Sequence, residues 1–332
     1  MSTNSARLVI APNWIGDAVM SLPVLRALKR NAPNRRLAVL ARPGPAAIYR
    51  AEGSADEVRV APGLLGSIRA AARGGFGEAW LLPNSFRAAL VPFLAGIPER
   101  IGYASDGRVE LLTCALPPPP RTGHQLRDYD PLLESRGIEP DDAPPRLAVP
   151  PESAERAREA LARSGLPPDG PLVLLAPGAA FGWTKRWPAD RFGRLGRLLG
   201  ERDLPCALVI GPGEEPLAEE ARRAAGGGNL PALGADLDPI GIAALAARAR
   251  VVVSNDSGPM HLAAAVGTPV VAIFGPTDPG RTGPSGVPSV ILDRYVFCSP
   301  CYLKECPYRH ECMREIEVED VMRAVEILDR KT

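Results

Sequence analysis

Short apolar runs alternate with amphipathic segments along most of the chain. Runs rich in Val, Leu, Ile and Ala are typical of buried strands. They cover residues 8–11, 37–41, 57–60, 79–82, 172–176, 206–210, 251–253 and 269–274. Apolar residues recur every three or four positions between them, which predicts helices at residues 19–28, 64–73, 88–94, 188–199, 216–225 and 318–330. Strands that alternate with helices in this way predict parallel sheets covered on both faces.

A change in composition near the middle of the chain predicts two domains. Prolines 117–120 open a proline-rich region, the segment 140–151 closes it as a linker, and a helix is predicted at 124–135. We therefore expect an α/β protein with two Rossmann-like, doubly wound domains, over residues 1–150 and 151–332, facing each other across a cleft. The last helix, at residues 318–330, is a candidate for packing back on the N-terminal domain.

Length and charge refine this picture only slightly. A chain of 332 residues suits two domains, and its net charge of +1 gives no indication of nucleic-acid binding. Residues 1–150 carry 18 Lys and Arg against 14 Asp and Glu, whereas the remainder carries 21 against 24. That bias would suit an anionic partner, although ordinary scatter of surface charge explains it nearly as well. The sequence shows no transmembrane segment or signal peptide, so a cytoplasmic protein is expected.

The segment 251–274 has the clearest chemical signature. It predicts a strand, a polar turn at 254–258, a helix with Pro259 in its first turn, and a second strand. Unpaired backbone N–H groups at such a helix N-terminus bind phosphate or diphosphate. Asp256 and His261 stand at the two ends of the turn and can face the same ligand, most simply a nucleotide. The alternative is that Asn255, Asp256 or Ser257 only caps the helix.

Asp17 follows the first predicted strand, where the first helix begins. It can be a helix cap, or it can be a general base, because a helix N-terminus favours an ionised carboxylate. An ionised carboxylate at a strand's carboxyl end is ready to accept a proton from a bound hydroxyl.

Two further loops also follow predicted strands. The segment 177–188 contains Gly178 and Gly182, which allow close backbone approach, and ends in Lys185-Arg186, a candidate phosphate-binding pair. The segment GPGEEP places Glu214 and Glu215 where a carboxylate could accept the ribose hydroxyls, although first-turn glutamates also suit the helix dipole. Neither loop is a P-loop or a GxGxxG fingerprint.

Four segments together resemble a known family. PNWIGDAVMSLPVLRALKR, LLPNSFRAALVPFLAGIPERIGY, PGAAFGWTKRWP and SNDSGPMHLAAAVGTPVVAIFGPTDP are similar to segments of the ADP-heptose:lipopolysaccharide heptosyltransferases, glycosyltransferases with the GT-B fold. The resemblance covers nearly the whole chain in the same order. The LPNS segment, the KRWP segment and the cysteine-rich tail resemble heptosyltransferase II most, although Trp183 is unusual.

The resemblance implies a role for each candidate residue. Asp17 matches the catalytic base, and Lys185 matches the lysine near the donor diphosphate. The implied donor contacts are Asp256, the backbone of Ser257 and Gly258, His261, and either Glu214 or Glu215. The implied reaction is an inverting, metal-independent transfer of heptose from ADP-heptose to the inner-core heptose of lipopolysaccharide, with no cofactor.

Other functions remain open at this point. A core heptosyltransferase with a different acceptor fits the same residues, because acceptor contacts lie in variable loops. A non-catalytic nucleotide-sugar binding protein would bind the donor and be indifferent to substitution of Asp17. A nucleotide-sugar epimerase on paired Rossmann domains is a further alternative. A dehydrogenase is disfavoured by the base-like Asp17 and because no GxGxxG follows the first predicted strand of either domain.

The implied acceptor is a lipid A–inner core saccharide at the membrane surface, which would make the protein peripheral to the inner membrane. This acceptor carries acidic sugars and phosphates, so basic residues of the first domain are candidates for binding it. They are Arg42, Arg87, Arg100, Arg108 and Arg127.

Four cysteines in the spacing C-x2-C-x4-C-x5-C form a separate feature, with His310 nearby. They are Cys298, Cys301, Cys306 and Cys312. Clustered cysteines in a cytoplasmic protein favour a metal or free thiols over disulfides. The spacing matches neither a standard zinc ribbon nor a ferredoxin, which favours thiols, reduced or partly oxidised, over a structural metal.

Overall fold

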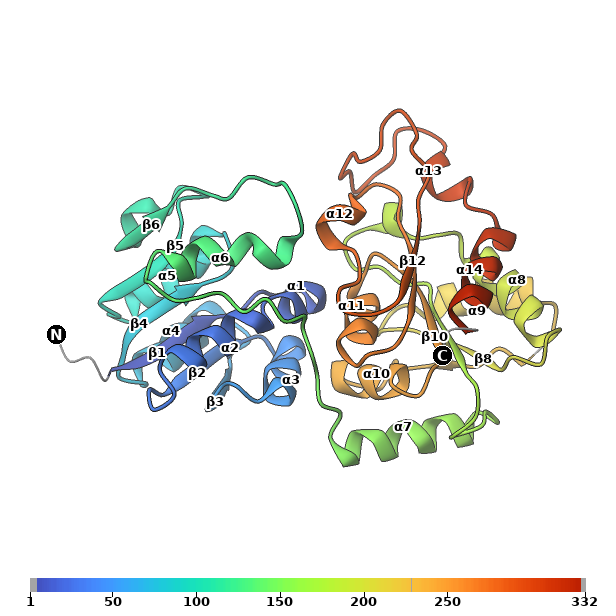
Figure 1. The fold of residues 1–332 in the computed structure, drawn as a ribbon, viewed down its shortest axis with the longest axis horizontal. Helices are drawn as coiled ribbons and strands as arrows, with labels where there is room; N and C mark the ends of the chain where they lie inside the picture. Colours follow the sequence, from blue (N-terminus) through green and yellow to red (C-terminus); the bar gives the residue numbers. More distant parts are fainter. Residues whose placement is uncertain (1–4, 228, 330–332) are drawn as a thin grey trace. The chain divides into compact units, whose positions relative to one another are not determined.

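The computed structural model describes residues 5–227 and 229–329, and the chain divides into two compact units, Met1–Pro145 and Arg146–Thr332 (Figure 1). Each unit contains one six-stranded parallel sheet with helices packed against it. The two units are described separately below. The division falls inside the proline-rich segment 140–151.

The sheet of the first unit has the strand order β3-β2-β1-β4-β5-β6. Its strands are β1 (Ala6–Ile10), β2 (Leu37–Ala41), β3 (Glu57–Val60), β4 (Phe76–Leu81), β5 (Glu99–Tyr103) and β6 (Cys114–Leu116). The chain moves outward from β1 to β3 and then crosses to the other side at β4. This reversal creates a switch point at the carboxyl ends of β1 and β4, where open α/β sheets bind ligands.

Helices cover both faces of this sheet. They are α1 (Ile15–Met20), α2 (Leu22–Asn31), α3 (Pro43–Glu52), α4 (Leu64–Ala72), α5 (Phe86–Leu94) and α6 (Asp130–Glu134), with 3-10 turns at Val109–Leu111 and Gln125–Tyr129. The prediction of a single helix at 124–135 is wrong, because this segment forms the 3-10 turn Gln125–Tyr129 followed by the short helix α6. Pro131 lies in the first turn of α6, where its missing N–H is tolerated, whereas further inside a helix its ring would clash.

The second unit repeats the same topology with the strand order β12-β11-β10-β7-β8-β9. Its strands are β7 (Val173–Ala176), β8 (Cys206–Val209), β9 (Ala232–Leu233), β10 (Val251–Asn255), β11 (Val270–Ile273) and β12 (Ser289–Leu292). β7 and β10 are parallel neighbours and are buried along their whole length. The switch point of this sheet lies at their carboxyl ends.

The helices of the second unit enclose its sheet in two apolar layers. They are α7 (Pro151–Arg163), α8 (Ala189–Gly200), α9 (Glu215–Ala225), α10 (Pro239–Ala246), α11 (Gly258–Ala265), α12 (Pro279–Thr282), α13 (Glu311–Arg314) and α14 (Val318–Asp329), with a 3-10 turn at Trp183–Lys185. α14 packs against α8 and against β10, β11 and β12 of its own unit. Arg330, the last residue of the predicted helix, lies outside the described residues. Within residues 5–227 and 229–329, no helix is long and apolar enough to cross a membrane.

Candidate active site

Asp17 lies at the carboxyl end of β1, in the first turn of α1. The N-cap of this helix is Trp14, so Asp17 does not occupy the capping position that was one interpretation of the sequence. Its Oδ1 instead accepts a hydrogen bond of 2.9 Å from Nε2 of Gln125, and the side chain stays half-buried. The structure therefore holds this carboxylate in a fixed orientation at the edge of the sheet.

Two buried tyrosines lie near this carboxylate. Tyr49 shares a hydrogen bond of 2.9 Å with the hydroxyl of Ser21. Burial raises the pKa of both Tyr49 and Tyr129, and the negative charge of Asp17 adds to the effect. Both phenols therefore remain neutral around the carboxylate. No sequence signal identifies Gln125, because it is 108 residues from Asp17 and comes from a separate 3-10 turn.

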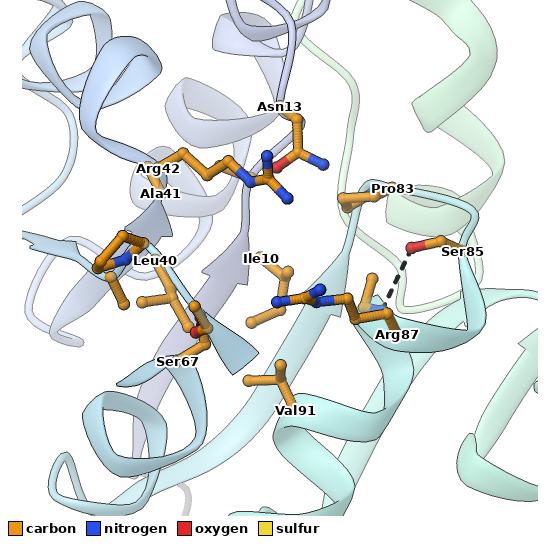
Figure 2. Close-up of a pocket in the computed structure, with 15 residues that line it drawn as sticks. Ile10, Asn13, Leu40, Ala41, Arg42, Ser67, Pro83, Ser85, Arg87 and Val91 are labelled. Atoms are coloured by element: carbon orange, nitrogen blue, oxygen red, sulfur yellow. Dashed lines mark hydrogen bonds between the residues drawn. The ribbon is translucent and has the colours of Figure 1, made fainter. Parts of the chain in front are cut away.

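A hollow of about 70 Å³ opens at the carboxyl ends of β1, β2, β3 and β4 (Figure 2). Ile10, Leu40 and Val91 give it an apolar lining, and Asn13 belongs to the same loop that leads to Asp17. Arg42 and Arg87 extend into the hollow from opposite sides (Figure 2). The hollow thus lies at the switch point of the first sheet.

The five arginines proposed to bind the acceptor differ in their surroundings. Arg108 is fully buried, its guanidinium donates to the carbonyls of Tyr103 and Ser85, and burial lowers its pKa to about 10. It is a core residue, which corrects the expectation that it faces the acceptor. The end of β5 and the loop at 83–85 leave backbone carbonyls that need a donor, and the guanidinium of Arg108 supplies it.

Arg100 and Arg127 also have partners within the chain. Arg100 donates to the carbonyls of Leu111 and Ile97, both at 2.6 Å. Arg127 forms ion pairs with Asp142 at 2.6 Å and with Asp130 at 3.5 Å. Arg42 and Arg87 are the two candidates that line the hollow.

In the second unit, Lys185, Asp256 and Thr277 form a buried polar cluster. Nζ of Lys185 is 2.6 Å from Oδ2 of Asp256, and the two side chains are 14% and 4% exposed. Oγ1 of Thr277 donates to the same oxygen at 2.7 Å. The ammonium also lies 5.0 Å from the centre of the Phe181 ring. Lys185 lies in the 3-10 turn after β7, and Asp256 and Thr277 lie in the loops after β10 and β11, so the fold gathers them at the switch point of the second sheet.

Asn255 ties two of these loops together. Its side chain is fully buried, with Nδ2 donating to the carbonyl of Pro177 at 2.8 Å and Oδ1 accepting the backbone N–H of Trp187 at 3.0 Å. Trp187 is itself buried and donates to the carbonyl of Ile316. The segment that carries Lys185 is therefore fixed at its end, and neither Asn255 nor Thr277 was predicted as a site residue.

The turn after β10 agrees with the predicted strand–turn–helix pattern. α11 begins at Gly258, its N-cap is Ser257, and no side-chain cap bond is made. Asp256 bonds to Lys185 and Thr277, so helix capping does not explain its presence. The N-terminus of α11 thus lies beside the Lys185 ammonium. His261 is buried on α11, with 6% of its surface exposed.

The two glutamates of the third loop have different positions. The carboxylate of Glu214 accepts the backbone N–H of Gly211 at 2.9 Å and lies against Gly178, whereas Glu215 is exposed in the first turn of α9. A Cβ atom at Gly178 would be 2.1 Å from both carboxylate oxygens of Glu214. Glu214, and not Glu215, therefore belongs to the loops around the ends of β7 and β8.

The cysteine-rich tail packs against the loop that carries Lys185. Oγ1 of Thr184 donates to the carbonyl of Leu303 at 2.7 Å, and the ring of His310 contacts the carbonyl of Thr184 and the edge of Trp183. Burial lowers the pKa of His310. The tail thus packs against Trp183 and Thr184, next to Lys185. The spacing of its cysteines does not predict this contact.

The four tail cysteines are free thiols in the structure, namely Cys298, Cys301, Cys306 and Cys312. Burial raises the pKa of Cys312 to about 11, with a smaller contribution from the other three thiols. Across the described ranges, no group of three or more His, Cys, Asp and Glu side chains is arranged to hold a metal ion. The state of these four cysteines, thiols or a structural metal site, stays a prediction from their spacing.

Comparisons with known proteins agree with this architecture. The model of glycosyltransferase family 9 (heptosyltransferase) matches residues 68–311. Lipooligosaccharide heptosyltransferase 2 of Haemophilus influenzae is 32% identical over 86% of this chain and 87% of its own length. Lipopolysaccharide heptosyltransferase 2 of Escherichia coli K12 is 31% identical over 83% and 84%. A solved structure of E. coli ADP-heptose lps heptosyltransferase II superimposes with a TM-score of 0.83 at 26% identity, covering 98% of this chain and 99% of that one.

Proposed function

Because the chain belongs to glycosyltransferase family 9, the heptosyltransferases, we propose that it transfers heptose from ADP-heptose to the inner-core heptose of lipopolysaccharide, as heptosyltransferase II. One observation carries the choice of acceptor. Similarity to heptosyltransferase 2 of H. influenzae extends over 86% of this chain. Neither unit alone makes up that share of the chain, so the similarity includes residues of both units. In this proposal the first unit binds the acceptor and the second binds the donor.

The second unit supplies charge for the donor. Lys185 and the N-terminus of α11 place positive charge at the switch point, where the diphosphate of ADP-heptose would lie. Negative charge grows on the ADP oxygen as its bond to the anomeric carbon breaks, and a fixed cation stabilises that charge. Asp256 and Thr277 hold the lysine in position. A diphosphate stabilised in this way is a good leaving group without an acid catalyst.

The first unit supplies the base. The carboxylate of Asp17 takes the proton from an acceptor hydroxyl while that oxygen forms its bond to the anomeric carbon. ADP leaves from the opposite face, so the configuration inverts through a transition state with oxocarbenium character. Gln125 orients the carboxylate by its 2.9 Å hydrogen bond. The buried phenols of Tyr49 and Tyr129, whose pKa values are raised, stay neutral beside the carboxylate.

ADP release from purified protein tests the proposed function. The protein is mixed with ADP-heptose and lipid A that carries one core heptose, with and without EDTA. Release that needs this acceptor and survives EDTA supports the heptosyltransferase II reaction. Release with lipid A that lacks the heptose, and none with the heptosylated acceptor, would instead assign a different acceptor position.

Glu214 is the carboxylate expected to bind the ribose hydroxyls. Glu214→Gln should weaken ADP binding by about tenfold, because hydrogen bonds to a charged acceptor contribute roughly 1.5–3 kcal/mol. Isothermal titration with ADP measures the change. Glu215→Gln is the matched control, since that side chain is exposed on α9, and its affinity should stay within twofold of wild type. The reverse ranking of the two variants would reassign the role to Glu215.

Gly178→Ala is expected to have the same effect as loss of Glu214. The added methyl group would lie 2.1 Å from both carboxylate oxygens, so Glu214 has to move away. We expect ADP affinity to fall by about tenfold and the double variant Gly178→Ala/Glu214→Gln to be no worse than either single one. Gly200→Ala is the control, because nothing lies within 4 Å of its added Cβ. Additive losses in the double variant would show that Gly178 acts through another contact.

A further inference from the structure

The segment between β12 and α13, residues 293–310, brings a second lysine to the switch point of the second sheet. Nζ of Lys304 lies 5.4 Å from the centre of the Phe181 ring, and Nζ of Lys185 lies 5.0 Å from the same centre. The sum of these two distances limits the separation of the two ammonium groups to about 10 Å. Lys304 is therefore a neighbour of the buried polar cluster that contains Lys185.

The backbone that leads to Lys304 is attached to two of the loops around this cluster. The N–H of Tyr302 donates to the carbonyl of Pro276, in the loop after β11, at 2.8 Å. The carbonyl of Leu303 accepts a hydrogen bond of 2.7 Å from the hydroxyl of Thr184, in the 3-10 turn after β7. β7 and β11 lie on either side of β10 in the sheet. The residues just before Lys304 thus connect the two loops that flank the end of β10.

Close contact with a glycine also fixes the position of Lys304. A Cβ atom at Gly182 would be 3.2 Å from the carbonyl oxygen of Lys304 and 3.5 Å from its Cα, so the missing side chain permits this approach. Tyr302 has a φ of 57°, a left-handed conformation that is unfavourable for a residue with a side chain. Such a conformation persists where the surrounding structure imposes it. The fold therefore determines where the backbone of Lys304 lies.

The charges of the two lysines are balanced differently. Lys185 forms an ion pair of 2.6 Å with Asp256, so a carboxylate of the protein already offsets its charge. Lys304 is exposed, and within residues 5–227 and 229–329 its ammonium makes no hydrogen bond or ion pair. Cation–π attraction to Phe181 holds this ammonium in place without neutralising it. Lys304 thus places a cation beside the cluster with no carboxylate of the described chain within ion-pair distance.

We propose that Lys304 is a second donor-binding lysine, whose ammonium contacts the diphosphate of ADP-heptose together with Lys185. The inference rests on the proposed function and adds a residue to its donor site. ADP leaves with one more negative charge than its diphosphate carries in ADP-heptose. Lys185 is already paired with Asp256, and the N-terminus of α11 adds only a partial charge. An unpaired ammonium close by offsets the remaining negative charge of the diphosphate.

The alternative role for Lys304 is packing of its aliphatic stem on Phe181. That role depends on the shape of the side chain and predicts no effect of its charge on a ligand. The proposed role depends on the charge and is specific for the phosphates of the ligand. Diphosphate binding by charge variants therefore distinguishes the two roles.

Titration with ADP tests the inference without any transfer reaction. Lys304→Gln removes the charge and should raise the dissociation constant of ADP by about tenfold, measured by isothermal titration. Adenosine, which has no phosphate, should bind wild type and Lys304→Gln equally, measured by NMR titration. Lys304→Arg keeps the charge and should recover much of the ADP affinity.

Arg309→Gln is the matched control, because it removes another exposed cation from the same segment. Its ADP affinity should stay within twofold of wild type. Equal ADP affinity in wild type and Lys304→Gln would overturn the inference, as would an equally large loss in Arg309→Gln. A loss of adenosine affinity as large as the loss of ADP affinity would also overturn it, because the substitution would then disturb the site as a whole.

Kinetics separate this inference from the proposed function. In the transfer assay, Lys304→Gln should raise the donor KM by about tenfold while the acceptor KM stays unchanged. A rise in the acceptor KM alone would overturn the inference and assign Lys304 to the acceptor. Transfer by the wild type, with unchanged ADP affinity in Lys304→Gln, would contradict the inference alone. ADP binding that depends on Lys304, in a protein that transfers no heptose, would contradict the proposed function and leave the inference standing.

Discussion

Asp17→Asn is expected to reduce heptose transfer by about 10²–10⁴-fold, the usual contribution of a general base, while ADP-heptose binding stays within twofold of wild type. The reason is that asparagine keeps the shape of the side chain and its contact with Gln125 but cannot accept the acceptor's proton. The turnover number is measured by ADP release, and the donor dissociation constant by calorimetry.

A matched control distinguishes this loss from a general effect of charge. Glu110→Gln removes one carboxylate from an exposed 3-10 turn of the same unit and should leave turnover unchanged. Unchanged turnover in Asp17→Asn would exclude Asp17 as the base. A comparable loss of donor affinity would show instead that Asp17 acts in binding.

Lys185→Gln is expected to lower turnover by about 10²–10³-fold, because one preorganised donor to developing charge contributes about that much. Donor affinity should fall as well, since the ammonium would bind the ground-state diphosphate. Arg186→Gln is the control at the neighbouring position. Its guanidinium donates to the carbonyl of Ala179 at 3.2 Å, so only a small loss is expected. Equal losses in both variants would argue against a specific role for Lys185.

The stability of the Lys185 variant requires a second measurement. Removing the lysine leaves the Asp256 carboxylate, 4% exposed, without its cation, and breaking such a buried pair costs about 3–5 kcal/mol of unfolding free energy. Lys185→Gln/Asp256→Asn removes both charges and should recover much of that stability without recovering turnover. Recovery of turnover in the double variant would mean that the lysine serves the fold rather than the leaving group.

Local sequence determined the secondary structure near the two switch points. Strand β2 was predicted with its exact bounds and β10 two residues short, because a buried parallel strand is a continuous apolar run bounded by polar turns. The polar turn after β10 and the Asp17 position after β1 were readable for the same reason. Short strands at the sheet margins, such as β6 and β9, were missed, since three or two residues give no periodicity.

Only the tertiary structure decided which polar side chains belong to the site. Gln125 bonds to Asp17 from 108 residues away in the sequence, and Thr277 bonds to Asp256 from 21 residues away. No sequence spacing predicts either hydrogen bond. Glu214 lies against Gly178, which has no Cβ, and accepts the N–H of Gly211, whereas Glu215 is exposed on α9. In the same way, no local sequence feature separates Arg108 from Arg87. Arg108 is distinguished by its hydrogen bonds to the carbonyls of Tyr103 and Ser85.

The sequence by itself thus determined the two βα sheets, their switch-point loops and the family. The tertiary structure decided which of the candidate arginines and glutamates are buried or paired with groups of the chain. The physical reason is that helix and strand periodicity depends on residues close together in the sequence. The burial and pairing of a charged side chain depend instead on groups that distant segments bring to it.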